Sequence, residues 1–429
     1  MARLSGDHDG HGRAGRHLIR SVGDRAARVG RALTGGDQRA YRDSLVALTI
    51  AGITSLVAGV TLALTTDTLE ELPGLLLLVP AALAVKGNVF GALGSRLGTS
   101  IHAGTFRLSA RLDTIVGANV AAAMLLSLVI AVIIAMLAKG VAIAFSISPT
   151  MSVADFIVVS ALGGVLASVL ILVITLLLAA GSVRFGWDLD NVVSPLVTAS
   201  SDVASLPSLV LAAQLASIDG VTPVLAWIAV VTSGLALLWA LLTRVALLRT
   251  IVRESLPILV VAGLLDLIAG ITIEKRLDDF LEFPVLLVLL PGFLGTAGAL
   301  GGVLSSRLAT KLHLGLIEPG PIPRGSAGSE VAMIFSLSIP VFVIAGLIAE
   351  LGGVLANQAS PGVVDLVLVS VTGGLLATAC VVVVAYYATV VAVRFGLDPD
   401  TYGIPMVTST LDFVGAFALI LAIVAFGVA

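Results

Sequence analysis

The chain has 429 residues, of which 58% are hydrophobic and 12% are charged, with a mean hydropathy of +1.11. A soluble domain carries about 25% charged residues, so this composition indicates a polytopic membrane protein and gives no reason to expect a nucleic-acid partner. The single cysteine, Cys380, excludes an intramolecular disulfide framework and a CxxC metal site.

The first 43 residues are polar and carry nine arginines, without the short apolar core of a cleavable signal peptide. Two interpretations of this segment remain open. One is a basic amphipathic helix that lies on anionic lipid, and the other is a partly disordered cytoplasmic tail. The first interpretation rests on apolar residues that share one helical face: Leu18, Val22, Ala26, Val29 and Leu33.

Eleven apolar segments follow this tail, and each is long enough to cross a bilayer as a helix. We therefore predict an all-α membrane protein with about eleven transmembrane helices. The segments cover residues 44–64, 74–101, 114–138, 153–181, 190–216, 221–248, 255–273, 284–312, 327–349, 363–392 and 401–428.

The sequence also contains an internal duplication. Pro80, Arg96, Leu97, His102 and Gly104 recur 211 residues later, and Asp155, Gly163, Arg184, Asp190, Pro195 and Asp202 recur 210 residues later. This many matches in the same order indicate two copies of one structural unit. We predict a basic tail at 1–43, repeat 1 at 44–216, a linker with one extra transmembrane helix at 217–253, and repeat 2 at 254–429.

The odd number of spans in each repeat determines how the repeats are related. A five-span unit ends on the opposite side of the membrane from where it begins, and the extra span at 221–248 restores the side. Both repeats then have the same orientation, with a pseudo-two-fold axis along the membrane normal. Twenty basic residues fall on the N-terminal side and three on the other, which predicts a cytoplasmic N-terminus and an extracytoplasmic C-terminus in the cell membrane.

Two aspartates in equivalent positions are the main candidate site. The pattern Asp-x4-Pro-x6-Asp occurs at 190–202 and again at 400–412, and each copy places one carboxylate about twelve residues inside an apolar segment. That is ~18 Å along a helix, near the middle of the hydrocarbon layer. A carboxylate there costs ~2.5–3.5 kcal/mol, and a cation between Asp202 and Asp412 would offset this cost. The alternative is that each aspartate is protonated and hydrogen-bonded within the bundle.

Oxygen atoms near these aspartates favour a hard divalent cation such as Mg²⁺ or Ca²⁺. Pro195 and Pro405 each lack an N–H, which leaves the carbonyls of Asn191 and Thr401 without their usual helical partner. The candidate pore-lining or ion-coordinating residues are Asn88, Asn191, Thr198, Ser201, Thr401 and Thr408. Four further acids at the inner start of these two helices are either helix caps or an acidic inner mouth: Asp188, Asp190, Asp398 and Asp400.

The second span of each repeat is rich in glycine and contains a proline, Pro80 or Pro291. This composition predicts a bent or broken helix whose backbone approaches its neighbours closely. Asn88 and Lys86 have no counterparts in repeat 2, where Ala299 and Ala297 take their places. Lys86 is expected to pair with Asp266, an acid near mid-depth in the seventh span.

These motifs resemble the MgtE family of magnesium channels and transporters, especially its fused two-repeat eukaryotic solute-carrier relatives. The resemblance rests on Leu78-Val-Pro-Ala-Ala-Leu-Ala-Val-Lys-Gly-Asn88, on Ser95-Arg-Leu97 and on the doubled aspartate pattern, and it covers residues 44–429 except the sixth span. In bacterial members a five-span unit dimerises, and the last span of each subunit supplies an aspartate to a central, largely hydrated Mg²⁺. The resemblance therefore implies that Asp202 and Asp412 hold Mg²⁺ within one chain.

The sequence departs from that family in two respects. It has no counterpart of the cytoplasmic helical and CBS domains that gate bacterial members, and repeat 2 lacks the Lys-Gly-Asn element. We expect a divalent cation channel or transporter, most simply for Mg²⁺, that is not an enzyme, needs no organic cofactor and needs no oligomer to form its pathway. The alternatives are a Na⁺- or H⁺-coupled transporter of another cation and a non-conducting membrane sensor or scaffold.

Overall fold

The computed structural model describes residues 38–428 except 186–188, 217, 219, 314–315, 318–319, 321 and 396–403. The described chain is helical, as the sequence predicts, and ten of its helices are long and apolar enough to cross a membrane. A shorter apolar stretch, Ala199–Ala213, belongs to an eleventh long helix, α7.

The helices of repeat 1 are α2 (Gln38–Ala63), α3 (Thr66–Glu71), α4 (Leu75–His102), α5 (Ile115–Ala144), α6 (Val153–Phe185) and α7 (Leu189–Ala213). The linker helix is α8 (Val221–Leu242). Repeat 2 contains α9 (Ala246–Glu274), α10 (Leu277–Glu282), α11 (Val285–His313), α12 (Ser326–Leu355), α13 (Val363–Phe395) and α14 (Ile404–Phe426).

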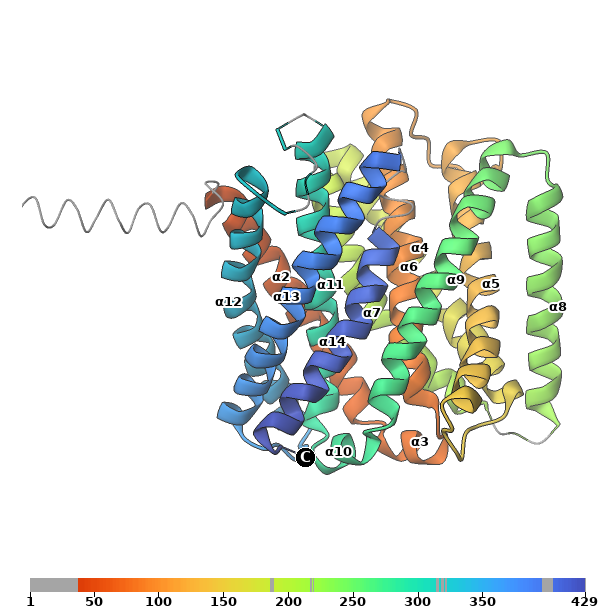
Figure 1. Ribbon diagram of the computed structural model, residues 1–429. Coiled ribbons are helices and arrows are strands. Elements are labelled where there is room, and N and C mark those ends of the chain that lie inside the picture. The colour runs from red at the N-terminus through yellow and green to blue at the C-terminus, as the bar shows by residue number, and fades with distance from the viewer. Residues whose placement is uncertain are drawn as a thin grey trace, which may run out of the picture.

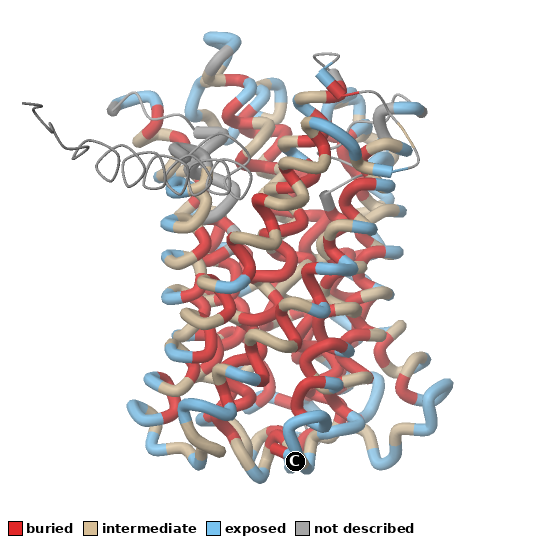
Figure 2. Tube along the Cα trace, turned by 60° about the vertical axis from the view of Figure 1, so that its left-hand side comes forward, coloured by how far each residue is buried: buried red, intermediate tan, exposed pale blue. Residues whose placement is uncertain are grey.

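The long helices run back and forth between two ends of one bundle (Figure 1). The short helices α3 and α10 and the C-terminus lie at one end, and α2 begins at the other (Figure 1). Buried residues line the centre of the bundle, whereas exposed residues gather at its ends and on its outside (Figure 2). The linker helix α8 lies at the edge, where it packs against α5, α6 and α9.

The first helix of each repeat packs against the other repeat. Helix α2 contacts α11 and α12, and α9 makes the equivalent contacts with α4 and α5. Glycine permits both crossings: a Cβ at Gly59 would lie 2.2 Å from the Val288 carbonyl oxygen, and one at Gly270 would lie 2.1 Å from that of Leu77. Gly270 follows Gly59 by 211 residues, and Val288 follows Leu77 by 211 residues, so one backbone contact is formed twice.

Further contacts repeat in the same way. The Ser160 hydroxyl donates to the Ala131 carbonyl oxygen over 2.8 Å, and the equivalent Ser370 donates to that of Phe342 over 2.7 Å. These bonds join α5 to α6 and α12 to α13. The duplication predicted from the sequence is therefore confirmed as two copies of one packing arrangement.

The proline-containing second spans differ from one part of the prediction. Pro80 lies within α4 and Pro291 within α11, and both helices continue without a break. Each proline sits in the second turn, so only a carbonyl near the start of the helix loses its partner. The close backbone approach that glycine predicts does occur, because a Cβ at Gly301 would lie 2.1 Å from Leu411 Cδ1.

Candidate cation site

Asp202 lies in α7 with 7% of its surface exposed, and it meets the first helix of its own repeat. The Ser55 hydroxyl of α2 donates a hydrogen bond to Asp202 Oδ2 over 2.9 Å. Gly295 of α11 faces the same oxygen, since a Cβ there would lie 3.6 Å from it. The carboxylate therefore sits where α2, α7 and α11 converge, which brings elements of both repeats together.

Asp412 lies in α14 and is half-buried, without a hydrogen bond to the part of the chain that the structure describes. A Cβ at Gly298 of α11 would lie 3.9 Å from Asp412 Oδ1. Residues three apart share one face of a helix, so Gly295 and Gly298 place Asp202 and Asp412 beside the same face of α11. Two ionised carboxylates beside one helix face repel one another.

A third acid, Asp266 of α9, joins this group. It is fully buried, and the Ser409 hydroxyl of α14 donates to its Oδ2 over 3.0 Å. Its Oδ1 is buried and has no hydrogen-bond partner among the described residues. Asp412 follows Ser409 by three residues on α14, so both lie on the face of α14 that is next to Asp266.

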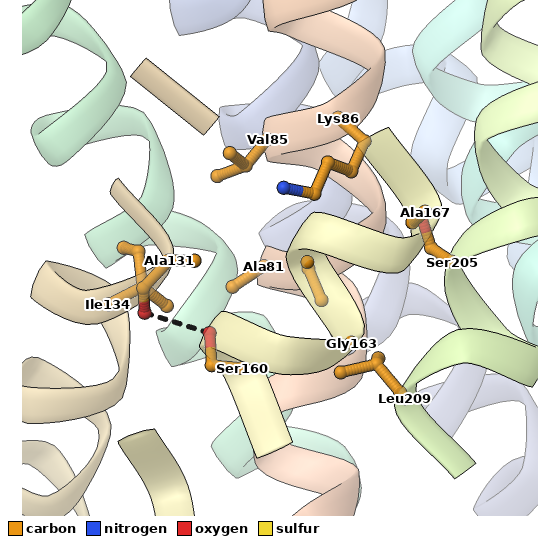
Figure 3. A pocket seen from close by; sticks show the side chains of 12 residues that line it. Ala81, Val85, Lys86, Ala131, Ile134, Ser160, Gly163, Ala167, Ser205 and Leu209 are labelled. Carbon is orange, nitrogen blue, oxygen red and sulfur yellow. Dashed lines mark hydrogen bonds between the residues drawn. The ribbon is translucent and has the colours of Figure 1, made fainter. Parts of the chain in front are cut away.

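The expected ion pair between Lys86 and Asp266 is wrong. The Lys86 ammonium donates to the hydroxyl of Ser127 on α5, and a Cβ at Gly164 of α6 would lie 3.1 Å from it. Figure 3 shows the Lys86 side chain extending into a small cavity that Ser160 and Ser205 also line. Lys86 thus points between α5 and α6, whereas Asp266 faces α14.

Asn88 also connects the two repeats. Thr408 Oγ1 of α14 donates to Asn88 Oδ1 of α4 over 3.3 Å. The Asn88 Nδ2 atom is buried without a partner in the described chain. Two of the predicted pore-lining residues therefore contact each other one turn from Asp412.

The other predicted ligands are less informative. The Ser201 hydroxyl donates to the Val197 carbonyl oxygen of its own helix over 2.8 Å. The remaining predicted residues lie wholly or with their side chains outside the described residues: Asp188, Asp190, Asn191, Thr198, Asp398, Asp400 and Thr401. The inner-mouth acids therefore stay a prediction.

The three acids form a row rather than a cage. Within the described ranges, no three His, Cys, Asp or Glu side chains are grouped closely enough to hold one metal ion. Asp202 and Asp412 lie beside one face of α11, and Asp266 joins them through its hydrogen bond with Ser409 of α14. A cation beside Asp412 would therefore complete its shell with hydroxyl, carbonyl or water oxygens, which suits the reluctance of Mg²⁺ to lose water.

Sequence reasoning missed Ser55, and it paired Asp266 with Lys86 instead of with Ser409. One signal was present: Ser55 and Asp266 are 211 residues apart and so occupy the same place in the two repeats. Both contact a last helix, through Asp202 in one case and through Ser409 in the other. This equivalence would have directed attention to Ser55 and would have indicated that Asp266 faces the last helix of a repeat.

Comparison with known proteins agrees with this architecture. Residues 79–212 and 290–422 both match the sequence model of MgtE, described as "Divalent cation transporter". The chain is 24% identical to solute carrier family 41 member 2 of Xenopus laevis, over 90% of this chain and 73% of that protein. It is 23% identical to member 3 of Mus musculus, over 82% of this chain and 75% of that protein.

A solved eukaryotic MATE transporter, AtDTX14, aligns over 90% of this chain and 95% of its own with 12% identity. Its TM-score of 0.35 is too low to bear on the fold.

Proposed function

Because the chain belongs to the MgtE family of divalent cation transporters, we propose that it carries Mg²⁺ through a site between Asp202 and Asp412. The observation that supports this site most directly is the placement of both carboxylates beside one glycine-lined face of α11. Two acids at such a depth repel each other and are costly to desolvate, and a divalent cation offsets both effects.

Both repeats contribute to this proposed site. Asp202 and Ser55 come from repeat 1, whereas Asp412 and the two glycines come from repeat 2. Each family match ends shortly after one of the two aspartates, at residues 212 and 422. One chain thus contains both halves of the site, and no second copy of the chain is needed to complete it.

The test is Mg²⁺ uptake into proteoliposomes without a Na⁺ or pH gradient, for the wild type, Asp202→Asn and Asp412→Asn. We expect uptake by each variant to fall by about 10- to 100-fold, the scale on which metal sites lose affinity when a supporting carboxylate is removed. Asp113→Asn is the matched control, because Asp113 is exposed in the loop after α4 and pairs with Arg111.

Full uptake by both Asp202→Asn and Asp412→Asn would reject the site. Wild-type uptake that needs a Na⁺ or pH gradient would instead support the coupled transporter.

We also propose that the N-terminus is cytoplasmic and that the protein lies in the cell membrane. The support is the distribution of charge: the loops joining α4 to α5 and α8 to α9 carry arginines, whereas α3 and α10 at the other end carry mostly acids. Replacing exposed Cys380 with serine and introducing a cysteine at Asp113 gives one reporter. We expect it to react with a membrane-impermeant maleimide only after the cells are permeabilised.

A further inference from the structure

We propose that Asp266 is a cation-binding residue, which with Asp412 and Ser409 forms a second position for the transported cation beside the Asp202–Asp412 position. This inference rests on the proposed function of the aspartate pair. It concerns a residue from α9, which lies in neither stretch that matches the family model. Asp412 is shared, so an ion could pass between the two positions without losing contact with that carboxylate.

The first argument is the unsatisfied oxygen of Asp266. The side chain is fully buried, yet only Oδ2 has a hydrogen-bond donor, and Oδ1 has none among the described residues. A buried carboxylate oxygen without a partner is costly, and acids inside transmembrane helices generally lie on ion pathways. A purely structural aspartate would be expected to have both oxygens satisfied.

The second argument is the position of Asp266 beside another acid. Asp412 lies on the same face of α14 as Ser409, and its carboxylate has no hydrogen bond to the described chain. Both carboxylates are negatively charged when ionised. Lys86, the basic residue expected to compensate Asp266, instead bonds Ser127. Two opposed carboxylates with a hydroxyl beside them have the oxygen chemistry and the charge that match a divalent cation.

The third argument compares the equivalent half of the site. In repeat 1, Ser55 occupies the place of Asp266 and bonds Asp202 directly. In repeat 2, Asp266 cannot donate to a carboxylate as Ser55 does, and Ser409 supplies a hydroxyl instead. Position 199, the repeat-1 equivalent of Ser409, is alanine. Repeat 2 therefore has both an added acid and an added hydroxyl that bonds it.

The shared carboxylate of Asp412 indicates how many ions the group holds. When ionised, Asp202, Asp266 and Asp412 carry a net charge of −3, and Lys86 bonds Ser127 instead of these acids. Two divalent cations would leave an excess positive charge inside the membrane and would repel each other across one carboxylate. The two positions are therefore occupied in turn by one ion.

The test uses the exchange of residues that the repeats offer. Purified full-length wild type, Asp266→Ser and the double variant Ser55→Asp/Asp266→Ser are titrated with Mn²⁺ and followed by electron paramagnetic resonance. The wild type should bind one Mn²⁺, and Asp266→Ser should bind it about 10- to 100-fold more weakly. The double variant, which moves the acid to the equivalent place in repeat 1, should recover most of the affinity.

Thermal stability in chelator separates binding from a structural role. Removing a buried carboxylate with an unsatisfied oxygen should leave Asp266→Ser at least as stable as the wild type without divalent cations. A structural role predicts the reverse: a less stable variant whose loss of binding the double variant does not recover. That result would overturn the inference, as would Mn²⁺ affinity unchanged in Asp266→Ser.

The outcomes also distinguish this inference from the proposed function. If Asp202→Asn loses Mn²⁺ binding and Mg²⁺ uptake while Asp266→Ser keeps both, the aspartate pair stands and the second position is rejected. If Asp202→Asn and Asp412→Asn keep both activities, the proposed function fails, whatever the result for Asp266→Ser.

Discussion

Repeat 1 and repeat 2 share their closest backbone contacts and differ in the polar side chains that they place between those contacts. Gly59 on Val288 and Gly270 on Leu77 are the same crossing formed twice. The polar positions do not match in this way: Lys86 corresponds to alanine, and Ser55 corresponds to Asp266. A glycine at a crossing tolerates no substitution, whereas a polar residue facing a shared pathway can change if the total charge still suits the ion.

The repeats differ in the same way near the loops that follow α4 and α11. Glu330 of α12 is fully buried and accepts hydrogen bonds from both Arg307 and Lys311 of α11. The equivalent position in repeat 1 is Asn119, whose amide donates to the Ile115 carbonyl oxygen of its own helix. The arginine is kept in both repeats, but Arg96 donates instead to Ser255 of α9. Equivalent arginines thus join different pairs of helices.

The largest effect should come from breaking what the repeats share. Even the single methyl group of Gly59→Ala or Gly270→Ala would lie about 2 Å from a backbone carbonyl oxygen, which cannot rotate away. Overpacking of this kind costs about 1–3 kcal/mol or more. We expect each variant to show a clearly lower melting temperature and a reduced yield of monodisperse protein in detergent by size-exclusion chromatography.

Gly91→Ala is the control for this pair, because Gly91 lies inside α4 with open space where its Cβ would be. It should behave like the wild type or better, since alanine favours helix over glycine. Normal folding of Gly59→Ala together with failure of Gly270→Ala would show that the two crossings are not equivalent, which would contradict the symmetry.

The features that the sequence predicts rest on hydropathy and on residues that occur at equivalent positions in both repeats. The helical class, the repeats and the depths of Asp202 and Asp412 follow from hydropathy and from matched positions, and the first two are confirmed by the fold and by the family match. The pairing of Lys86 with Asp266 was wrong because depth along a helix does not specify which face a side chain leaves from. Their equal depth suggested that the two side chains meet. In the fold, Lys86 leaves α4 toward α5 and α6, whereas Asp266 leaves α9 toward α14.

The contacts of Ser55 could not be predicted for a related reason. They depend on α2 crossing to the other repeat, where it packs against α11 while still reaching α7. Five-span units could also pack with each first helix on its own repeat, and apolar periodicity does not distinguish the two arrangements. Glycine spacing at 59 and 270 was the available signal, but its meaning depends on the partner carbonyl, which is distant in sequence.

The smallest expected effect comes from making the repeats more alike. Asn88→Ala gives α4 the residue that α11 has at the equivalent position. It removes one of two acceptors of the Thr408 hydroxyl, the other being the Pro405 carbonyl oxygen. One neutral hydrogen bond is worth about 0.5–1.5 kcal/mol, so Mg²⁺ uptake in proteoliposomes should fall by roughly 2- to 10-fold. The fall should be smaller than that for Asp412→Asn, because no charge is lost.

Asn119→Ala is the matched control for Asn88→Ala, since both remove a buried amide from repeat 1 and both amides have one unsatisfied atom. Within the described chain, Asn119 bonds only its own helix, near the start of α5. Its replacement should leave uptake unchanged, even if stability falls slightly. Equal losses in the two variants would mean that Asn88 acts through packing. A loss confined to Asn88→Ala would place the amide beside the ion and would show that the pathway needs the asymmetry that duplication alone does not provide.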